Sequence, residues 1–507
     1  MPFACFQSEP NFGYSPVYSI VEGINEINNL KQLDVLHVSI EYYPAAKAGG
    51  LADVVGALPK YLNENKLHTA VIIPKHSTKW IKAQKWVSVF NGSIKIKNDT
   101  YPFSVEAHHD LGEHPLYVMD IPGLFDRESI YIDQETGYGY TDDYLRNIVF
   151  QTAVLDWVSA MRHFPKSLHC HDHHTGLLPF MMNHCVDYQK LSKVPTVFTI
   201  HNGAYHGSFD WEYNYLIPRY DMNAKGLLEW NDQINPLACG VKCCWKLTTV
   251  SPGYMDELQY SSNGLESLFE HEASKSQGVI NGIDINVWDP STDELIDTVL
   301  KKDLTSFKKA NKKALCKQFD IDLSLPLITF IGRLAYEKGA HLLPDLFCRY
   351  LDKYQDVNLL VLGTGNKDTQ KLLCNVQEMY PKNVHVHIGY DEALAHQLYA
   401  GSDFIIMPSK VEPCGLNQMY AMRYGTIPIV HSVGGLRDTV IDIQKENGYG
   451  ICFSKANVFN AYDAIQRAKS LYADKKEVKR LQKYVAKLDF SWKNSATQYA
   501  EIYRTLK

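Results

Sequence analysis

Short runs of apolar residues alternate along the chain with segments whose apolar positions recur every three to four residues. The runs are rich in β-branched residues, so they predict buried strands, and the segments between them predict helices. The predicted strands lie at 34–40, 70–74, 116–121, 167–171, 195–200, 248–250, 326–331, 357–362, 384–388, 403–408 and 427–431. Helices are predicted at 148–162, 237–247 and 392–400, after Gly49 and Cys414, and from 475 onward. The alternation predicts two successive series of β-α-β units with parallel sheets.

Two segments depart from this rhythm. Residues 86–97 alternate apolar and polar about Asn91 and Gly92, which predicts a β-hairpin with its turn at that dipeptide. Residues 284–324 are polar and carry paired lysines, including Lys308-Lys309 and Lys312-Lys313. This composition predicts a linker followed by a helix on the protein surface.

The two β-α-β series predict an α/β fold with two doubly wound, Rossmann-like domains that face each other across a deep interdomain cleft. We expect an N-terminal extension at 1–30, a first domain at 31–285, a second domain at 286–487 and a closing segment at 488–507. Doubly wound sheets bind ligands beyond the carboxyl ends of their strands. The polar loops that follow the predicted strands are therefore the candidate sites.

Bulk properties narrow the classes of function. The 507 residues are 45% hydrophobic and 21% charged, as in an ordinary soluble globular protein. The formal net charge of -6 offers no basic field to nucleic acid or an anionic membrane, and no apolar run approaches the roughly 20 residues of a membrane helix. No Lys or Arg precedes Lys31, unlike a signal or transit peptide. The eleven scattered cysteines include no CxxC pair, so we expect reduced thiols in a cytoplasmic protein.

The stretch 403–438 joins two predicted strands through a loop and a helix. The helix opens at Cys414, Gly415 and Leu416, where free backbone N–H groups would form an anion site, most often for phosphate. Glu412 stands just before this positive helix end, where a carboxylate would repel a bound diphosphate. It either caps the helix or contacts a part of the ligand that is not phosphate.

A second loop of this kind follows the first predicted strand. It carries Lys47 ahead of Gly49 and Gly50, so a cation and two residues that allow close backbone approach stand together. The order of residues fits neither a Walker A loop nor a GxGxxG fingerprint. A simple tight turn explains these glycines nearly as well as phosphate binding does.

A dense run of histidines ends another predicted strand, at His169, His171, His173 and His174. Strand alternation splits the run between two faces, and no Cys pair or HExxH helix supports a closed metal site, so we assign no metal. His171 at the strand end is better explained as a residue that faces the ligand crevice, although a satisfied core histidine is the alternative. The next strand ends in the same way at His201.

Six ordered motifs carry a resemblance to a known family. They are Lys47-Ala48-Gly49-Gly50-Leu51-Ala52-Asp53, His171-Asp172, Thr199-Ile200-His201-Asn202, Asn281-Gly282-Ile283-Asp284, Gly332-Arg333-Leu334 with Lys338-Gly339, and Glu412-Pro413-Cys414-Gly415-Leu416. Over 34–507 the sequence resembles the bacterial glycogen synthases and plant starch synthases, which are retaining glucosyltransferases of the GT-B fold. The resemblance implies transfer of glucose from a nucleotide-glucose, with ADP-glucose favoured over UDP-glucose, to the non-reducing end of an α-1,4-glucan.

The resemblance also implies roles for individual residues, without a metal or a cofactor. The catalytic set would be His171 at the donor glucose, Glu412 at the glucose hydroxyls, and Arg333 and Lys338 at the departing diphosphate. The substrate-binding set would be Lys47, Gly49, Gly50, Asp53, Asn281, Tyr390, Cys414, Gly415 and Leu416, with Tyr390 stacked on the nucleotide base. The closing segment would cross back to the N-terminal domain.

Three positions differ from the usual family pattern: His173 replaces a Trp, Asn417 a Thr and Asp143 an Asn. Two other functions remain open at this point. One is a retaining GT-B transferase with a small-molecule acceptor. The other is a catalytically dead glucan-binding protein, which has no need of the diphosphate cations Lys47, Arg333 and Lys338.

Overall fold

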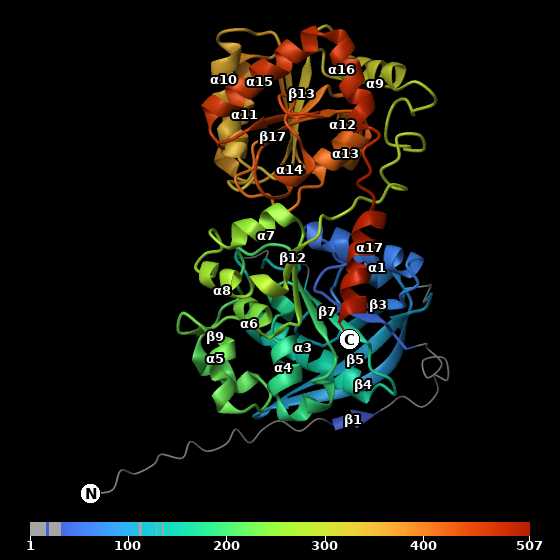
Figure 1. Cartoon of the computed structure of the whole chain (residues 1–507), viewed down its shortest axis with the longest axis vertical. Helices are drawn as coiled ribbons and strands as arrows, with labels where there is room; N and C mark the ends of the chain where they lie inside the picture. Colours follow the sequence, from blue (N-terminus) through green and yellow to red (C-terminus); the bar gives the residue numbers. More distant parts are fainter. Residues whose placement is uncertain (1–16, 20–31, 111–113, 128, 134–135, 507) are drawn as a thin grey trace, which may run out of the picture. The chain divides into compact units, whose positions relative to one another are not determined.

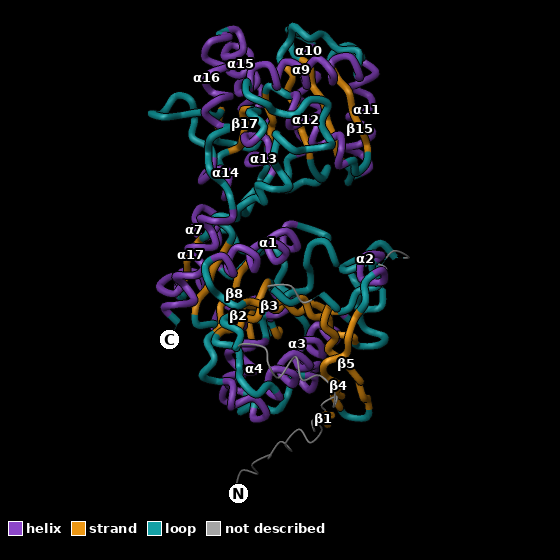
Figure 2. The backbone as a smooth tube through the Cα atoms, turned by 90° about the vertical axis from the view of Figure 1, so that its right-hand side faces the viewer, coloured by secondary structure: helices purple, strands orange, loops and turns teal. Residues whose placement is uncertain are grey.

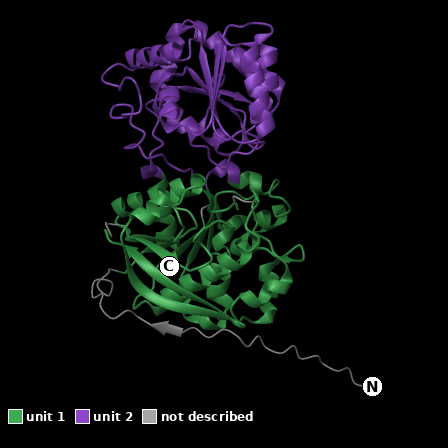
Figure 3. Cartoon of the chain, turned by 180° about the vertical axis from the view of Figure 1, so that it is seen from behind, with its two compact units in different colours: residues 1–249, 255–279, 495–507 green, residues 250–254, 280–494 purple. Residues whose placement is uncertain are grey.

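The computed structural model describes residues 17–19, 32–110, 114–127, 129–133 and 136–506. The predicted extension at 1–30 lies outside the described residues except for strand β1 (Val17–Ser19). The chain divides into two compact units, coloured separately in Figure 3. Unit 1 comprises Met1–Thr249, Met255–Val279 and Ser495–Lys507, and unit 2 comprises Val250–Tyr254 and Ile280–Asn494.

Unit 1 is built on one large sheet with the strand order β1-β4-β5-β6-β3-β2-β7-β8-β11-β12. The strands from β6 to β12 pair in parallel, whereas β1, β4 and β5 form an antiparallel edge. Their bounds are β2 Val35–Val38, β3 Thr69–Pro74, β4 Trp86–Ile96, β5 Asp99–His108, β6 Leu116–Asp120, β7 Ser167–His171, β8 Thr196–Ile200, β11 Lys246–Thr249 and β12 Ser276–Gly278. The short strands β9 (Glu229–Trp230) and β10 (Gln233–Ile234) pair separately.

Helices cover both faces of this sheet (Figures 1 and 2). They are α1 Gly50–Glu64, α2 Lys79–Ala83, α3 Asp143–Ala160, α4 Leu178–His184, α5 Lys225–Leu228, α6 Pro236–Cys243 and α8 Glu266–His271, with α7 (Pro252–Leu258) and α17 (Trp492–Thr505) shared between the units. The strands β2, β3, β7 and β8 are buried along their whole length. Burial on both faces agrees with the scarcity of charged residues in these strands.

The predicted hairpin at Asn91 and Gly92 is wrong. Strand β4 runs through both residues and ends at Ile96. The turn into β5 follows Ile96, which pairs with Asp99, and Lys97 in this turn has a φ of 53°. Gly92 serves packing instead, because a Cβ at this position would lie 2.5 Å from the ring of Phe103. Glycine beneath a cross-strand aromatic ring therefore imitated a turn signal.

Unit 2 is a six-stranded parallel sheet between two layers of helices, as Figure 3 shows. The strand order is β15-β14-β13-β16-β17-β18, with bounds β13 Leu327–Ile331, β14 Asn358–Gly363, β15 Val384–Ile388, β16 Phe404–Met407, β17 Ile427–His431 and β18 Ile451–Phe453. The helices are α9 Leu304–Gln318, α10 Leu343–Leu351, α11 Lys367–Met379, α12 Glu392–Gly401, α13 Asn417–Arg423, α14 Gly434–Thr439, α15 Val458–Ala473 and α16 Lys475–Val485.

Helix α9 corrects the prediction of a surface helix. Lys309 and Lys313 are exposed, but Lys308 and Lys312 are buried, with 5% and 6% exposure. Lys308 donates to the hydroxyl of Thr426 at 2.6 Å, and burial lowers its pKa to about 7. Each lysine pair thus contributes one surface residue and one buried residue. None of the described helices combines the length and the apolar character that crossing a bilayer requires.

Candidate active site

Both sheets have a topological switch point, where consecutive connections leave a strand in opposite directions. In unit 2 it lies between β13 and β16, and in unit 1 between β2 and β7. Loops at the carboxyl ends of such strand pairs form the crevice in which doubly wound sheets bind ligands. The loops after β13 and β16 carry Arg333, Lys338 and Glu412. The loops after β2 and β7 carry the Lys47 motif and His171.

Glu412 is the centre of the unit 2 site. Its carboxylate is buried, with 4% exposure of the residue, and it accepts two hydrogen bonds from Lys338 Nζ, at 2.7 and 2.8 Å. Ser409 Oγ donates a third bond, at 2.9 Å. The alternative that Glu412 caps the following helix is wrong, because α13 begins at Asn417 and has no side-chain cap among the described hydrogen bonds. The carboxylate instead anchors the Lys338 ammonium group at the switch point.

Arg333 follows β13 directly and is the exposed cation of this site. Its side chain is 62% exposed and donates to Glu337 Oε1 at 2.7 Å. A solvent-exposed pair of this kind contributes little stability, so Arg333 can exchange its partner for a ligand anion at small cost. The backbone around it is tightly packed, since a Cβ on Gly363 of the neighbouring strand would lie 2.0 Å from the carbonyl oxygen of Gly332.

The segment before α13 lies beside another predicted residue, Asn281. Gly415 has a φ of 72°, a conformation that favours glycine, and burial raises the pKa of the neighbouring Cys414 to about 12, so this thiol is neutral. Asn281 is buried beside Cys414, and its Oδ1 accepts no hydrogen bond from the described part of the chain. A buried acceptor without a donor is unusual in a folded protein.

Two further unit 2 residues have clear positions. Asn417, which replaces the usual Thr, donates from Nδ2 to the carbonyl oxygen of Ile331 at 2.7 Å. It therefore ties the start of α13 to the end of β13 across the switch point. Tyr390 follows β15 and is 83% exposed, which leaves most of its ring surface accessible.

In unit 1 the Lys47 loop is organised by a residue that the sequence did not single out. The buried carboxylate of Glu41 accepts hydrogen bonds from the backbone N–H groups of Ala48, at 2.6 Å, and Gly49, at 2.9 Å. Tyr131 donates to the same carboxylate at 2.5 Å. The N–H group of Gly49, which was expected to meet the donor diphosphate, is thus occupied by an internal anion. Gly50 is the first residue of α1.

Lys47 is held by the other charged residue of its motif. Its ammonium group lies 2.7 Å from Asp53 on the first turn of α1, and the side chain of Lys47 is 44% exposed. Asp53 is predicted to bind substrate, and in the structure its carboxylate accepts a hydrogen bond from Lys47 Nζ. The pair is solvent-accessible, so Lys47 remains able to contact an anion.

Asp172 directly follows β7 and has a strained backbone, with φ at 57° and ψ at 177°. Its buried carboxylate accepts from the backbone N–H groups of His201, at 2.7 Å, and Asn202, at 3.3 Å, so it fastens the β7 loop to the end of β8. Burial nevertheless raises the pKa of Asp172 to about 7. Strain of this type persists only where the surroundings enforce it, and it is concentrated at functional sites.

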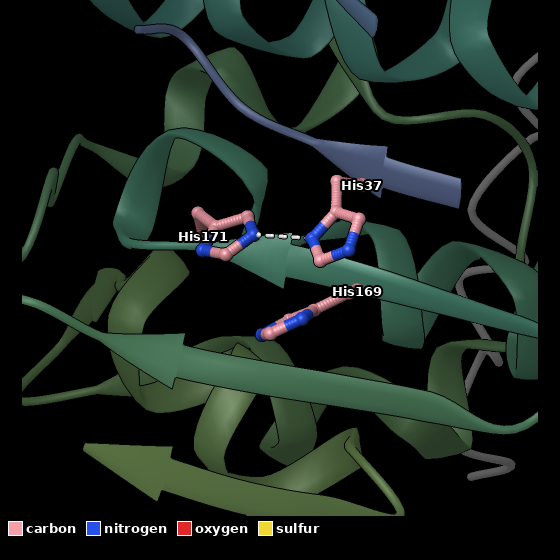
Figure 4. A group of neighbouring side chains, drawn as sticks. All are labelled: His37, His169 and His171. Carbon is pink, nitrogen blue, oxygen red and sulfur yellow. Dashed lines mark hydrogen bonds between the residues drawn. The ribbon is translucent and has the colours of Figure 1, made fainter. Parts of the chain in front are cut away.

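His171 belongs to a buried cluster of imidazole rings (Figure 4). His37 on β2 lies with its Nδ1 3.1 Å from His171 Nε2, and His201 after β8 lies with its Nε2 3.0 Å from His171 Nδ1. Burial lowers the pKa of His37 and of His201 to about 3, and that of His171 well below its usual value. All three rings are therefore neutral at neutral pH.

One ring nitrogen from each of His37, His169 and His171 lies within 4.8 Å of the other two, which raises the question of a metal site. The ring geometry does not fit one. His169 is stacked on His171 with centroids 4.1 Å apart, and its two nitrogens lie 2.6 Å from Tyr503 Oη and 2.5 Å from Thr199 Oγ1. A metal ligand needs its lone pair aimed at the ion in the plane of the ring, and stacked rings cannot share such a point. The arrangement is that of a hydrogen-bonded network.

The remaining departures from the family pattern occupy packed positions. A Cβ on Gly207 would lie 2.3 Å from the ring of His173, so this ring fills the space beside Gly207. Asp143 is the first residue of α3 and lies 3.4 Å from the buried guanidinium of Arg146. Neither residue contacts the predicted catalytic set in the described hydrogen bonds.

Comparisons with known proteins bear on this arrangement. Residues 34–271 match the model of the starch synthase catalytic domain, and residues 311–488 match the model of the group 1 glycosyl transferases. A glycogen synthase of Flavobacterium johnsoniae is 46% identical over 480 residues, covering 94% of this chain and 99% of its own. The chain belongs to the glycogen synthase family. A glycogen synthase of Clostridioides difficile is 36% identical over 493 residues, with 94% and 100% of the two chains covered.

Solved structures agree. The catalytic domain of starch synthase IV from Arabidopsis thaliana, bound to ADP and acarbose, superposes with a TM-score of 0.82 at 30% identity and covers 94% of this chain and 99% of its own. Sucrose-phosphate synthase from Thermosynechococcus elongatus reaches a TM-score of 0.59 at 18% identity, with the same coverage, which shows a shared fold alone. The fold is that of the GT-B glycosyltransferases, and the protein is a glucosyltransferase of the glycogen and starch synthase type.

Proposed function

We propose that this enzyme transfers glucose from ADP-glucose to the non-reducing end of an α-1,4-glucan with retention of configuration, with UDP-glucose as the alternative donor. The ADP-bound starch synthase neighbour supports the choice of donor. We also propose that the chain forms a first domain at 31–285 and a second domain at 286–487, as the sequence predicts. The closing segment at 488–507 packs on the first domain. The 2.6 Å approach of Tyr503 Oη to His169 supports this packing. The ten cysteines in the described part of the chain are free thiols. Free thiols support our proposal that the protein is cytoplasmic.

The observation that carries the proposal is the ion pair between the partly exposed Lys338 and the buried Glu412 at the unit 2 switch point. Transfer from a nucleotide sugar builds negative charge on the departing diphosphate and positive charge on the anomeric carbon. A cation fixed in advance stabilises the negative charge on the diphosphate without reorganisation during the reaction. Lys338 is fixed in this way by Glu412. Arg333 adds a positive charge that can exchange its Glu337 partner for the diphosphate. The remaining lone pairs of Glu412 accept hydrogen bonds from glucose hydroxyls.

The other site residues complete the assignment. Asn281 offers its unpaired Oδ1 to a hydroxyl, Cys414 to Leu416 line the same loop, and the exposed ring of Tyr390 stacks on the base. In unit 1, Lys47 and the backbone at Gly50 meet the donor, and His171 acts at the glucose. Asp53 and Gly49 act indirectly, because one holds Lys47 and the other is bound by Glu41. The cations are the protein's own, so the proposal needs no metal and no cofactor.

Incorporation of labelled glucose into glycogen tests this function, with ADP-glucose and UDP-glucose supplied separately. We expect polymer from at least one donor and a higher kcat/KM with ADP-glucose. Absence of labelled polymer with both donors would refute the proposal. A soluble disaccharide product in its place would favour the small-acceptor alternative.

Matched arginine variants test the site. Arg333 and Arg349 each pair with a carboxylate four residues away at 2.7 Å, and both are more than half exposed. We expect Arg333→Ala to lower kcat/KM by about 10²–10³-fold, the usual effect of removing a group that stabilises transition-state charge, and Arg349→Ala to leave it unchanged. Lys338→Ala and Glu412→Ala should lower kcat as strongly. Near wild-type turnover in all three site variants would show that the site is misplaced.

A further inference from the structure

The hydrogen-bond chain through His171 has an end that is closed off from solvent. His37 and His171 are completely buried, whereas His201 is 9% exposed. His37 Nε2 has no hydrogen-bond partner within the described part of the chain. The chain therefore starts at His37 in the interior and passes to His171, as Figure 4 shows. From His171 it continues to His201, which follows β8.

Neutral rings allow only two arrangements of protons along this chain. In one, His37 donates from Nδ1 to His171 Nε2, and His171 donates from Nδ1 to His201 Nε2. In the other, His201 donates to His171, and His171 donates to His37. Each neutral imidazole carries a single N–H group, so the choice at one ring fixes the other two.

The interior end decides between the two arrangements. In the second, His37 would carry its proton on Nε2, which would be a buried N–H group without an acceptor. In the first, His37 Nε2 is a buried lone pair without a donor. Orphaned buried N–H groups are rarer than under-satisfied acceptors, so the first arrangement is favoured.

We propose that His37 is a positioning residue for His171, and that it holds the His171 ring in the tautomer with the proton on Nδ1. The ring of His169, 4.1 Å from that of His171 and 4.8 Å from that of His37, is packed against both and opposes their rotation. Tyr503 Oη and Thr199 Oγ1 in turn hold His169. The N–H group of His171 that faces His201 is thereby ready to donate to an oxygen of the donor glucose in place of His201. This last consequence rests on the proposed function, whereas the tautomer does not.

The tautomer can be measured directly in the full-length wild-type protein. In a sample with ¹⁵N-labelled histidine rings, long-range ¹H–¹⁵N correlations distinguish a protonated Nδ1 from a protonated Nε2. The His171 signals are assigned by their loss in the His171→Gln variant. A proton on Nδ1 is the expected result, and a proton on Nε2 would overturn the proposal whether or not the enzyme transfers glucose.

Two variants of His37 test the consequence for catalysis. The amide nitrogen of Asn occupies the place of Nδ1, so His37→Asn keeps a hydrogen-bond donor to His171. His37→Phe keeps a ring but has no hydrogen-bond donor. We expect His37→Phe to lower kcat at least about tenfold, with a KM for the nucleotide-glucose within about threefold of wild type. We expect His37→Asn to retain most of the wild-type kcat. Equal losses in both variants would overturn the positioning role. Absence of transfer by the wild-type enzyme would instead refute the proposed function and leave the measured tautomer standing.

Discussion

At the scale of single residues, carboxylates buried at strand ends organise the loops of the site. Glu41 binds the backbone of the Lys47 loop, Glu412 binds Lys338, and Asp172 binds the backbone after β8. The sequence indicated only Glu412 as functional. Glu41 and Asp172 stand directly after predicted strands, which is the signal that could have found them. The partners of Asp172 depend on the pairing of β7 with β8, whereas the backbone partners of Glu41 lie in its own loop.

Asp172 should make stability depend on pH in an unusual direction. Its folded pKa of about 7 lies above the usual Asp pKa of 3.8, so between these values the folded state binds more protons than the unfolded state. Ionisation therefore costs stability as pH rises, by up to about 1.4 kcal/mol per pH unit. Asp172→Asn lacks this charge and keeps an oxygen that accepts from His201 N–H.

We expect the unfolding temperature of Asp172→Asn, measured relative to wild type, to rise between pH 5 and pH 8. Thermal denaturation at both values measures the difference. An offset that is the same at the two pH values would contradict the raised pKa.

At the scale of elements, the sequence predicted most strands within one or two residues. Strands β7, β15 and β17 match their predicted bounds. The errors have physical causes. Gly92 imitated a turn because it packs beneath Phe103, and helix α15 was missed because small and polar residues dilute its apolar positions.

The site residues were also predicted only in part. The motifs located the loops, but the chain of His37, His171 and His201 is created by pairing β2 with β7 and β7 with β8. Those neighbours are far apart in sequence. A histidine inside the apolar run 34–40 was the available signal.

Helix α9 offers a matched test of the error about its lysines. Lys312 lies 2.7 Å from Asp403, and both side chains are at most 10% exposed, whereas Lys313 is on the surface. We expect Lys312→Ala to destabilise unit 2 by about 3–5 kcal/mol, because it leaves a buried carboxylate without its cation. Lys313→Ala should change stability by less than about 0.5 kcal/mol. Calorimetric unfolding of both variants measures this, and equal effects would mean that both lysines face solvent.

At the scale of the whole molecule, neutral buried histidines are concentrated in unit 1. Burial lowers the pKa of His37 and His201 to about 3 and that of His76 and His173 to about 4. Burial also holds the pKa of His169, His171 and His174 well below the usual value. The described histidines of unit 2 with lowered pKa, His341 and His385, are only partly buried.

This distribution should make unit 1 labile in acid. Below pH 6.5 each of these histidines takes up a proton when the chain unfolds but not while it is folded, so stability falls as pH falls from 6.5 toward the folded pKa. Between pH 6.5 and 5.5 the loss is about 1 kcal/mol per histidine, and the opposing gain at Asp172 comes from a single group. Hydrogen exchange at pH 7 and at pH 5.5 tests the expectation, with unit 2 as the internal control. Peptides of β2, β7 and β8 should lose protection at the lower pH while those of β13 and β16 retain it. Equal loss in both units would mean that the buried histidines do not govern the acid stability.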